Sequence, residues 1–263
     1  MKKIFRDDFI DEYWEKRWES AGVDGSKFIN MNIYPIKYSE MVIDSSKDIL
    51  EAGCGNGRLL FHYKNSGKNI KGIDYSQNAI NNILKKDSSI NVVQGSITEL
   101  PYTNESFDCI MAFGLYHGLE DEENIDKAFE ETSRVLKKDG KIVFSVRLNS
   151  LENDILEYKV KSQKQGRVFN KFHKWQFDED DIKYYMDKHN FRIDNIDYVR
   201  NVSVLFKFEF FKAKDMKKNN FNESKARSEG FKLNLLGRII DKFLHKKFPK
   251  YFSNLMVVIA TKE

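Results

Sequence analysis

The sequence of 263 residues has only two cysteines and three prolines, and it lacks any long apolar run. Cys54 and Cys109 do not have the paired spacing of zinc ligands, so we expect no metal site. One cysteine lies in a glycine-rich stretch and the other inside an expected strand, which makes neither an obvious nucleophile. Unpaired thiols are typical of the cytoplasm, and we expect the protein there.

No segment approaches the ~18 consecutive apolar residues that cross a bilayer, so we expect no transmembrane helix. The N-terminus becomes acidic at Asp7 and Asp8 before any apolar core, which is not the pattern of a signal peptide. We find no repeat, low-complexity tract or linker. The length allows one large core or two small ones, and because no linker is evident we expect a single domain over residues 1–263.

The net charge is only +4, which does not by itself indicate a nucleic-acid partner. The charge is unevenly spread, however. Residues 201–250 hold 13 lysines and arginines against 5 aspartates and glutamates. This basic segment needs a separate explanation from the rest of the chain.

The rest of the sequence is organised around residues 48–57, which read Asp-Ile-Leu-Glu-Ala-Gly-Cys-Gly-Asn-Gly. A short apolar run leads to an acidic residue, Glu51, and then to glycines at three alternate positions: Gly53, Gly55 and Gly57. Apolar periodicity resumes directly afterwards. The pattern predicts a strand, a tight turn and a helix whose N-terminal N–H groups face a ligand.

The common dinucleotide fingerprint is Gly-x-Gly-x-x-Gly, but here the third glycine comes one residue early. A second acid, Asp74, ends another strand-like run about 20 residues later, where a ribose diol is bound in nucleoside-binding folds. A generic glycine-rich turn and a nicotinamide site are the alternatives. The stretch Glu-x-Gly-x-Gly-x-Gly resembles motif I of the class I S-adenosylmethionine-dependent methyltransferases.

This resemblance implies S-adenosylmethionine as cofactor, S-adenosylhomocysteine as product, and no metal. The three glycines of the turn are expected against the methionine and ribose part of the cofactor. Glu51 is expected to fix the ammonium end, Asp74 to accept from the ribose hydroxyls, and Tyr75 to lie on the adenine face.

Two further strand ends complete the expected cofactor site. Ser96 stands where many relatives have an aspartate that accepts from the adenine amino group, so this contact is expected to be weaker, while the N–H of Ile97 can still serve. Phe113 ends the fourth expected strand, at the point where the family places the reacting methyl group.

Residues 5–18 place aromatic side chains at helical spacing, which predicts a helix packed on the core. The same stretch resembles the lid that many small-molecule methyltransferases have before motif I. Through that resemblance, Tyr13 becomes a candidate contact to cofactor or acceptor. The alternative is that the aromatic residues only pack the helix.

Alternating strand-like and helix-like runs predict an α/β fold, with a mostly parallel sheet covered by helices on both faces. The resemblance implies that this is a Rossmann-like doubly wound sheet of seven strands. The resemblance adds an antiparallel last strand at 255–260, an aromatic loop at 172–177 and a helix at 178–189. A helix over 121–137 is expected to end with the cations and glycine of residues 137–140. We place N-terminal lid helices at 1–46, the core at 47–200 and 252–263, and a basic insertion at 201–251.

His117 is the candidate catalytic base, because imidazole titrates near neutrality. Tyr116 beside it and His173 in the expected aromatic loop are the other catalytic candidates. A simple turn histidine is the alternative for His117, and an amine or thiolate acceptor would need no base. The chain lacks the Asn/Asp-Pro-Pro-Tyr motif of amino-directed base methyltransferases, which argues against that activity. Methylation of carbon 5 of a pyrimidine needs an attacking thiolate after the fourth strand, and Cys109 lies inside that strand, which argues against this activity too.

Within the basic segment, alternating apolar residues at 202–210 predict a strand. Apolar residues at helical spacing over 233–244 predict an amphipathic helix with basic residues behind it. Three roles remain open: a helix packed on the sheet edge, a cap over the acceptor site, and a surface over 231–250 that contacts anionic lipid or a partner.

The sequence as a whole predicts methyl transfer to O or N of a small-molecule or glycan-type acceptor, which could be anionic. An RNA methyltransferase that uses the basic segment and a noncatalytic cofactor-binding scaffold are the rivals. No RNA-binding module is recognisable, so a nucleic-acid partner is not expected. The sequence does not predict an oligomeric state.

Overall fold

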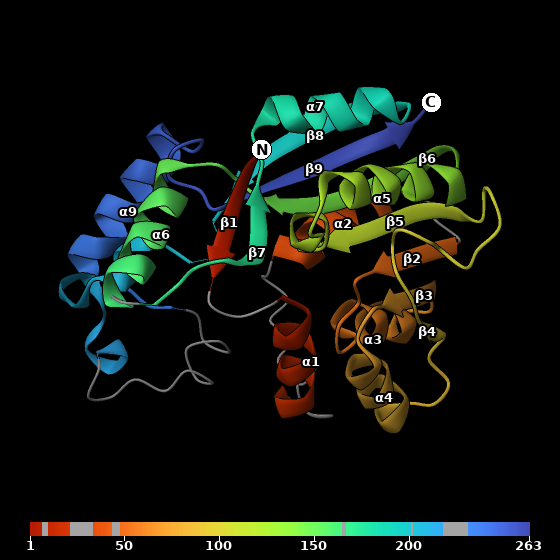
Figure 1. Cartoon of the computed structure of the whole chain (residues 1–263), viewed down its shortest axis with the longest axis horizontal. Coiled ribbons are helices and arrows are strands. Elements are labelled where there is room, and N and C mark those ends of the chain that lie inside the picture. The colour runs from red at the N-terminus through yellow and green to blue at the C-terminus, as the bar shows by residue number, and fades with distance from the viewer. Residues whose placement is uncertain (7–9, 22–33, 44–47, 165–166, 201, 218–230) are drawn as a thin grey trace. The chain divides into compact units, whose positions relative to one another are not determined.

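A computed structural model describes residues 1–6, 10–21, 34–43, 48–164, 167–200, 202–217 and 231–263 (Figure 1). The chain divides into two compact units. The core unit comprises Met1–Arg147, Val168–Asp197 and Val257–Glu263, and the insert unit comprises Leu148–Arg167 and Tyr198–Met256. The insert unit thus includes the predicted basic insertion and a second stretch between Leu148 and Arg167.

The main sheet has seven strands in the order β4-β3-β2-β5-β6-β9-β8. A single strand, β9, runs antiparallel to the rest, which confirms the predicted Rossmann-like class. This last strand of the chain lies between β6 and β8 rather than at the edge. The strands are β2 (Asp48–Ala52), β3 (Asn69–Asp74), β4 (Val92–Gln94), β5 (Phe107–Phe113), β6 (Leu136–Arg147), β8 (Phe191–Val199) and β9 (Leu255–Lys262).

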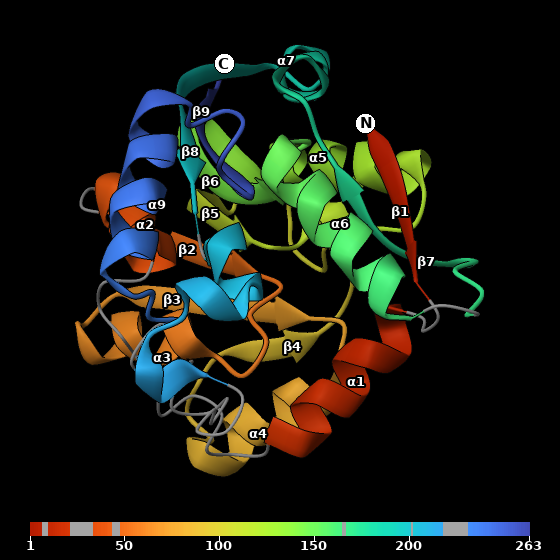
Figure 2. The ribbon, with the colours of Figure 1, turned by 90° about the vertical axis from the view of Figure 1, so that its left-hand side faces the viewer.

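Helices flank this sheet, as its apolar strands require. The central strands β2, β5 and β9 are buried almost throughout, so both faces of the sheet must be covered. In the core unit α2 and α5 cover β6 from opposite faces (Figure 2). The core-unit helices are α1 (Ile10–Ala21), α2 (Tyr34–Ile43), α3 (Arg58–Asn65), α4 (Gln77–Lys86), α5 (Glu122–Val135) and α7 (Glu179–Lys188).

A small second sheet replaces two expected elements. The strand β1 (Lys2–Arg6) pairs antiparallel with β7 (Lys171–Gln176). The predicted helix over 5–18 was therefore wrong in its first turn, and the predicted aromatic loop at 172–177 is a strand. Ile4 and Arg6 are buried while Phe5 is exposed, which is the two-residue period of a strand. Asp7 and Asp8 lie outside the described residues.

Residues 137–140, which were expected to end the helix over 121–137, belong to a strand instead. The helix α5 ends at Val135, and β6 begins at Leu136. The register with β5 shifts within this stretch, where Asp139 has a φ of 60°. Lys137 bonds Asp108 at 2.9 Å and Asp48 at 3.1 Å, so its charge pairs with two strand ends rather than with helix carbonyls.

The predicted strand at 202–210 was also wrong. The chain there forms two short 3-10 helices, Val204–Lys207 and Glu209–Phe211. Three consecutive residues, Val204–Phe206, are buried together with Met216 and Leu233 in a small apolar cluster. A strand cannot bury consecutive side chains on one face, so packing overrode the alternating pattern.

The insert unit also holds α6 (Leu151–Gln163) and α9 (Leu235–Lys247). Ile155 and Leu156 of α6 and Ile240 of α9 pack against the same apolar cluster. The helix α9 confirms the predicted amphipathic helix in position. Among the described residues, no helix combines the length and apolarity that a bilayer crossing requires.

Candidate functional site

The glycine turn between β2 and α3 adopts a backbone that side chains disfavour. Gly53, Gly55 and Gly57 have φ angles of 72°, 51° and 74°, all in the left-handed region. This explains the alternate spacing of the glycines, because every second residue of the turn has a positive φ angle that glycine adopts most readily. A Cβ on Gly55 would lie 2.6 Å from the ring of Trp18, so the turn is also closely approached from α1.

Asp74 at the end of β3 holds this turn in place. One of its carboxylate oxygens accepts from the N–H of Gly55 at 2.7 Å, and the other accepts from the N–H of Ser76 at 2.9 Å. Burial raises the pKa of Asp74, and these two hydrogen bonds oppose the rise. Each oxygen keeps a further lone pair, so the carboxylate can accept from a diol while it shapes the turn.

Glu51, at the carboxyl end of β2, is buried beneath the same turn. One of its oxygens accepts from the N–H of Leu60 at 3.2 Å. Gly57, at the N-cap of α3, offers no side-chain cap, so Glu51 satisfies one of the free N–H groups of that helix end. Burial raises the pKa of Glu51 to about 8, against the opposing influence of Arg58. A buried acid with so high a pKa favours a cationic ligand beside it.

The helix α1 carries the aromatic part of the site. Trp14 and Trp18 stack at 5.7 Å between ring centroids, and the guanidinium of Arg17 lies over both rings. Glu15 of the same helix accepts from the N–H of Gln77 at 3.2 Å and from the amide of Asn78 at 2.8 Å. These bonds attach α1 to the start of α4, next to the glycine turn.

These elements enclose a cavity of about 570 Å³. Its volume lies within the ~300–1,000 Å³ that is usual for small-molecule sites. It opens at the carboxyl ends of the parallel strands, where open α/β sheets bind ligands. The predicted residues that line it are Glu51, Gly53, Gly55, Asp74, Tyr75, Ser96, Ile97, Phe113 and His117.

The residues that follow β3 and β4 contribute both apolar and polar side chains to the cavity. Tyr75 is exposed within the lining, and Ile97 is buried. The Ser96 hydroxyl bonds the hydroxyl of Thr98 at 2.7 Å and accepts from its N–H at 3.2 Å. Ser96 is therefore already engaged locally, which agrees with the weaker adenine contact expected for a serine at this position.

His117 lies in the 3-10 helix η2 (Tyr116–Gly118), just after β5. Its side chain is buried, and its Nδ1 has no hydrogen-bond partner within the described part of the chain. Burial lowers the pKa of His117 well below its usual value, and the nearby charges of Arg147 and Lys174 lower it further. The imidazole is thus neutral at pH 7, as a proton acceptor must be.

Four predicted residues do not line the cavity. Tyr116 is fully buried, stacks on Phe129 and bonds Thr132 at 2.8 Å, so its position does not support a catalytic role. The hydroxyl of Tyr13 accepts a hydrogen bond from Arg17 on α1, and Tyr13 does not line the cavity. His173 lies in β7, and Gly57 caps α3 beneath the turn.

Several lining residues were not singled out from the sequence. Most come from α1 and from the loop between β5 and α5: Trp14, Glu15, Arg17, Trp18, Leu115, Leu119 and Glu120. The others are Arg58 at the start of α3, Thr98 after β4 and Asn124 in α5. The aromatic stripe of α1 was the available signal, but it did not show which residues face inward. Arg17 matters most, because its buried Nε has no hydrogen-bond partner among the described residues.

Metal chemistry has no evident place in the described residues, where no group of three or more His, Cys, Asp or Glu side chains could hold an ion. The two cysteines are buried and free. Burial raises the pKa of Cys54 well above its usual value, so it is a poor nucleophile.

Comparison with known proteins agrees with this geometry. Residues 50–144 match a family described as "Methyltransferase domain". An uncharacterised protein of Methanocaldococcus jannaschii is 27% identical over 96% of this chain and 90% of its own length. An uncharacterised methyltransferase of Oceanobacillus iheyensis is 31% identical over 52% of this chain, and the match spans only 66% of that relative.

The fold is shared with a solved S-adenosylmethionine-dependent methyltransferase from Archaeoglobus fulgidus. The TM-score is 0.59 at 17% identity, and the match covers 96% of this chain and 100% of that one. The family match covers the glycine turn and the four strand ends that form the cavity floor. The family match over residues 50–144, the shared fold and the geometry of the site together support a class I S-adenosylmethionine-dependent methyltransferase, with S-adenosylmethionine as the cofactor.

Proposed function

We propose that this methyltransferase methylates O or N of a small-molecule or glycan-type acceptor. The observation that carries the proposal is the cavity itself. One continuous space of about 570 Å³ joins the glycine turn, Glu51 and Asp74 to the neutral imidazole of His117. The stacked rings of Trp14 and Trp18 line the same space, which suits an acceptor small enough to enter.

The residues present fit the cofactor group by group. Glu51 offers a buried carboxylate to the ammonium, and the unpaired Nε of Arg17 offers a donor to the carboxylate of the methionine part. Asp74 offers its remaining lone pairs to the ribose hydroxyls, and Tyr75, Ser96 and Ile97 offer a face and polar atoms to the adenine. When bound, the cofactor supplies an electrophilic methyl group.

The protein's own part in the reaction is positioning and proton removal. Holding two reactants in line contributes most of the acceleration in such displacements. At the acceptor end, His117 is neutral and its Nδ1 is unpartnered within the described chain, so it can take the proton of a hydroxyl acceptor. The positive charges of Arg147 and Lys174, which help to lower the pKa of His117, support an anionic acceptor at that end of the site.

Calorimetry and a transfer assay test the proposal together. Purified protein is titrated with S-adenosylmethionine and, separately, with NAD. Radiolabelled methyl donor is then incubated with a panel of hydroxy acids, amines, sugars and RNA. We expect binding of the methyl donor alone, and transfer to a small acidic compound. Donor binding with transfer only to RNA would contradict the acceptor class and leave the cofactor assignment standing.

A further inference from the structure

The helix α9 turns its apolar side chains outward. Leu235, Ile239 and Phe243 recur every four residues and are 67%, 59% and 56% exposed, and Leu236 beside them is also exposed. We call these four residues the α9 apolar strip. Exposed large apolar side chains grouped on one helix face are uncommon in soluble proteins, and they mark interaction sites.

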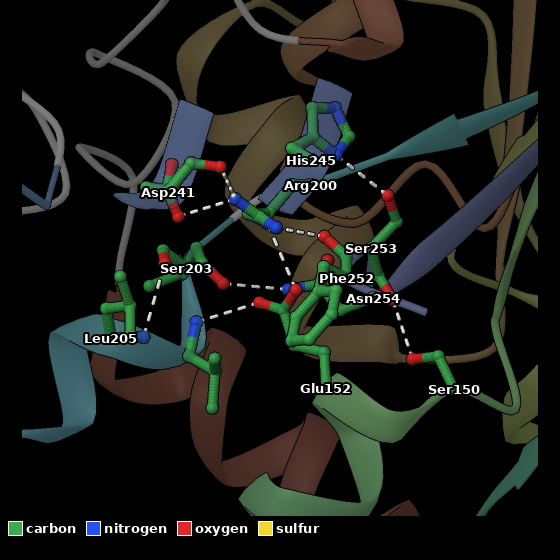
Figure 3. Close-up of polar contacts among 12 residues, drawn as sticks. Ser150, Glu152, Arg200, Ser203, Leu205, Asp241, His245, Phe252, Ser253 and Asn254 are labelled. Atoms are coloured by element: carbon green, nitrogen blue, oxygen red, sulfur yellow. Dashed lines mark hydrogen bonds and ion pairs between the residues drawn. The ribbon is translucent and has the colours of Figure 1, made fainter. Parts of the chain in front are cut away.

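The opposite, inward side of α9 packs Ile240 on the apolar cluster and makes polar contacts through Asp241 and His245 (Figure 3). Asp241 pairs with Arg200, whose Nε also bonds Glu152 at 3.0 Å. His245 bonds Ser253 at 3.0 Å, and Asn234 caps the helix through the N–H of Gly237 at 2.8 Å. Rotating the helix to bury the strip would break all of these contacts. The outward direction of the strip is therefore built into the insert unit.

Basic residues border the strip. Arg238, Lys242, Lys246 and Lys247 are exposed and form no ion pair with any other described residue. At 100° per residue, Arg238 and Lys242 fall on one side of the strip and Lys247 on the other. The single acid of α9, Asp241, is already paired with Arg200 on the inward side of the helix. The outward face of α9 thus combines apolar side chains with uncompensated positive charge.

This combination identifies the chemistry of the partner. An interfacial helix buries an apolar face at the boundary between headgroups and acyl chains, while lysines and arginines bind anionic headgroups. With 13 residues, α9 is too short to cross a bilayer and suits a position parallel to its surface. We propose that α9 docks the insert unit on the surface of a bilayer that contains anionic phospholipid. The proposal does not depend on the acceptor or on catalysis.

Vesicle co-flotation of the full chain tests the proposal. The protein is mixed with vesicles of phosphatidylcholine alone, or of phosphatidylcholine and phosphatidylglycerol in equal amounts. We expect flotation only with the anionic vesicles, and a strong decrease at high salt because the charges are screened. Absence of flotation with anionic vesicles would overturn the proposal.

Two variants separate the apolar and the charged contributions. Ile239→Ser with Phe243→Ser should weaken vesicle binding by about tenfold or more, because the buried apolar area is lost. Lys242→Glu with Lys246→Glu should weaken it by roughly 25-fold or more, at about fivefold for each cation removed. Donor binding by calorimetry and the circular dichroism spectrum should stay unchanged, because all four side chains are exposed.

Matched controls carry the same changes elsewhere. Lys127→Glu with Lys138→Glu alters the net charge equally, and Tyr184→Ser removes an exposed aromatic residue from α7. Vesicle binding should not respond to either. An equal loss in the controls would show nonspecific attraction and overturn the proposal. So would a dimer in sedimentation that Ile239→Ser with Phe243→Ser makes monomeric, since a second copy would then cover the strip.

Discussion

The core unit and the insert unit both withdraw glutamate and histidine side chains from solvent, but they use these side chains differently. In the core unit, Glu51 has one main-chain donor at 3.2 Å, and the Nδ1 of His117 has no partner within the described chain. In the insert unit, Glu152 bonds both Arg200 and Val204, and His245 bonds Ser253. Burying a charged group without a full set of partners costs stability. The core unit thus keeps polar groups available for a ligand, whereas the insert unit uses them to hold its own segments together.

Arg200→Met is expected to have the largest effect, because it breaks the network of the insert unit. Glu152 and Asp241 would lose their cation, and removing one partner of a buried pair costs roughly 3–5 kcal/mol. Urea unfolding measures the loss. Lys242→Met, next to Asp241 in sequence but on the exposed face of α9, removes an exposed cation and should change stability by less than about 0.5 kcal/mol. Equal effects of the two variants would show that the network does not stabilise the protein.

His117→Asn tests the core unit at its acceptor end. Asparagine keeps a polar side chain of similar size but cannot act as a base. We expect kcat to fall about 100-fold, as is typical when a general base is lost. Because the pKa of His117 lies well below 6.5, the wild-type rate should not decline as pH falls from 8 to 7 through this group. Donor affinity should be unchanged, and an unaltered kcat would exclude His117 as the base.

Asp74→Ala tests the ribose end. The carboxylate both shapes the turn through the N–H of Gly55 and is proposed to accept from the ribose. Leaving those hydroxyls unpaired costs roughly 1.5–3 kcal/mol, so donor affinity should fall about tenfold or more. Asp74→Asn retains the shape of the side chain but not its charge, so its donor affinity should lie between that of the wild type and that of Asp74→Ala. Calorimetry that finds wild-type affinity in the alanine variant would remove Asp74 from the cofactor site.

Glu51→Gln should have the smallest effect on donor affinity, but it should clearly change the number of protons released when the donor binds. Because the pKa of Glu51 is about 8 when buried, the group is mostly protonated at pH 7 and must lose that proton to pair with an ammonium. This cost offsets much of the pairing, so we expect only about a fivefold loss of donor affinity, near 1 kcal/mol.

The proton itself is measurable by calorimetry in two buffers of different ionisation enthalpy. At pH 7 the wild type should release close to one proton for each donor bound, and Glu51→Gln none. The stability of the ligand-free protein follows the same pKa. A folded-state pKa raised from 4.5 to about 8 means that stability falls as pH rises through this range. Glu51→Gln should flatten that decline.

The core unit was largely predictable from the sequence. The glycines at positions 53, 55 and 57 indicated a backbone conformation that other residues disfavour. Asp74 followed at the distance in sequence expected for an acid that binds a ribose. Such signals are local, because the turn dictates the residue type at each position. The contribution of α1 was less predictable. Its aromatic spacing indicated a helix but not that Trp14 and Trp18 would face the cavity while Tyr13 would not.

The insert unit was harder to predict, because its order rests on contacts distant in sequence. Glu152 and Arg200 are 48 residues apart, and Arg200 and Asp241 are 41 apart. The alternation at 202–210 suggested a strand, but burial of Val204–Phe206 in one cluster produced short 3-10 helices. The amphipathic pattern of α9 located the helix correctly. It could not reveal that Leu235, Ile239 and Phe243 would be the exposed residues of that helix.

The antiparallel direction of β9 has a consequence for how this chain can vary. The strand starts at the rim where β6 and β8 finish, and Asn254 bonds both Leu148 and Val199 at 3.3 Å across that meeting point. The two excursions that build the insert unit therefore leave from neighbouring points on a single rim. Neither has to cross the sheet or interrupt its hydrogen bonds. Lengthening, trimming or exchanging the whole module is thus compatible with an unaltered catalytic scaffold, which makes this rim a natural place for new specificity and new attachments to arise.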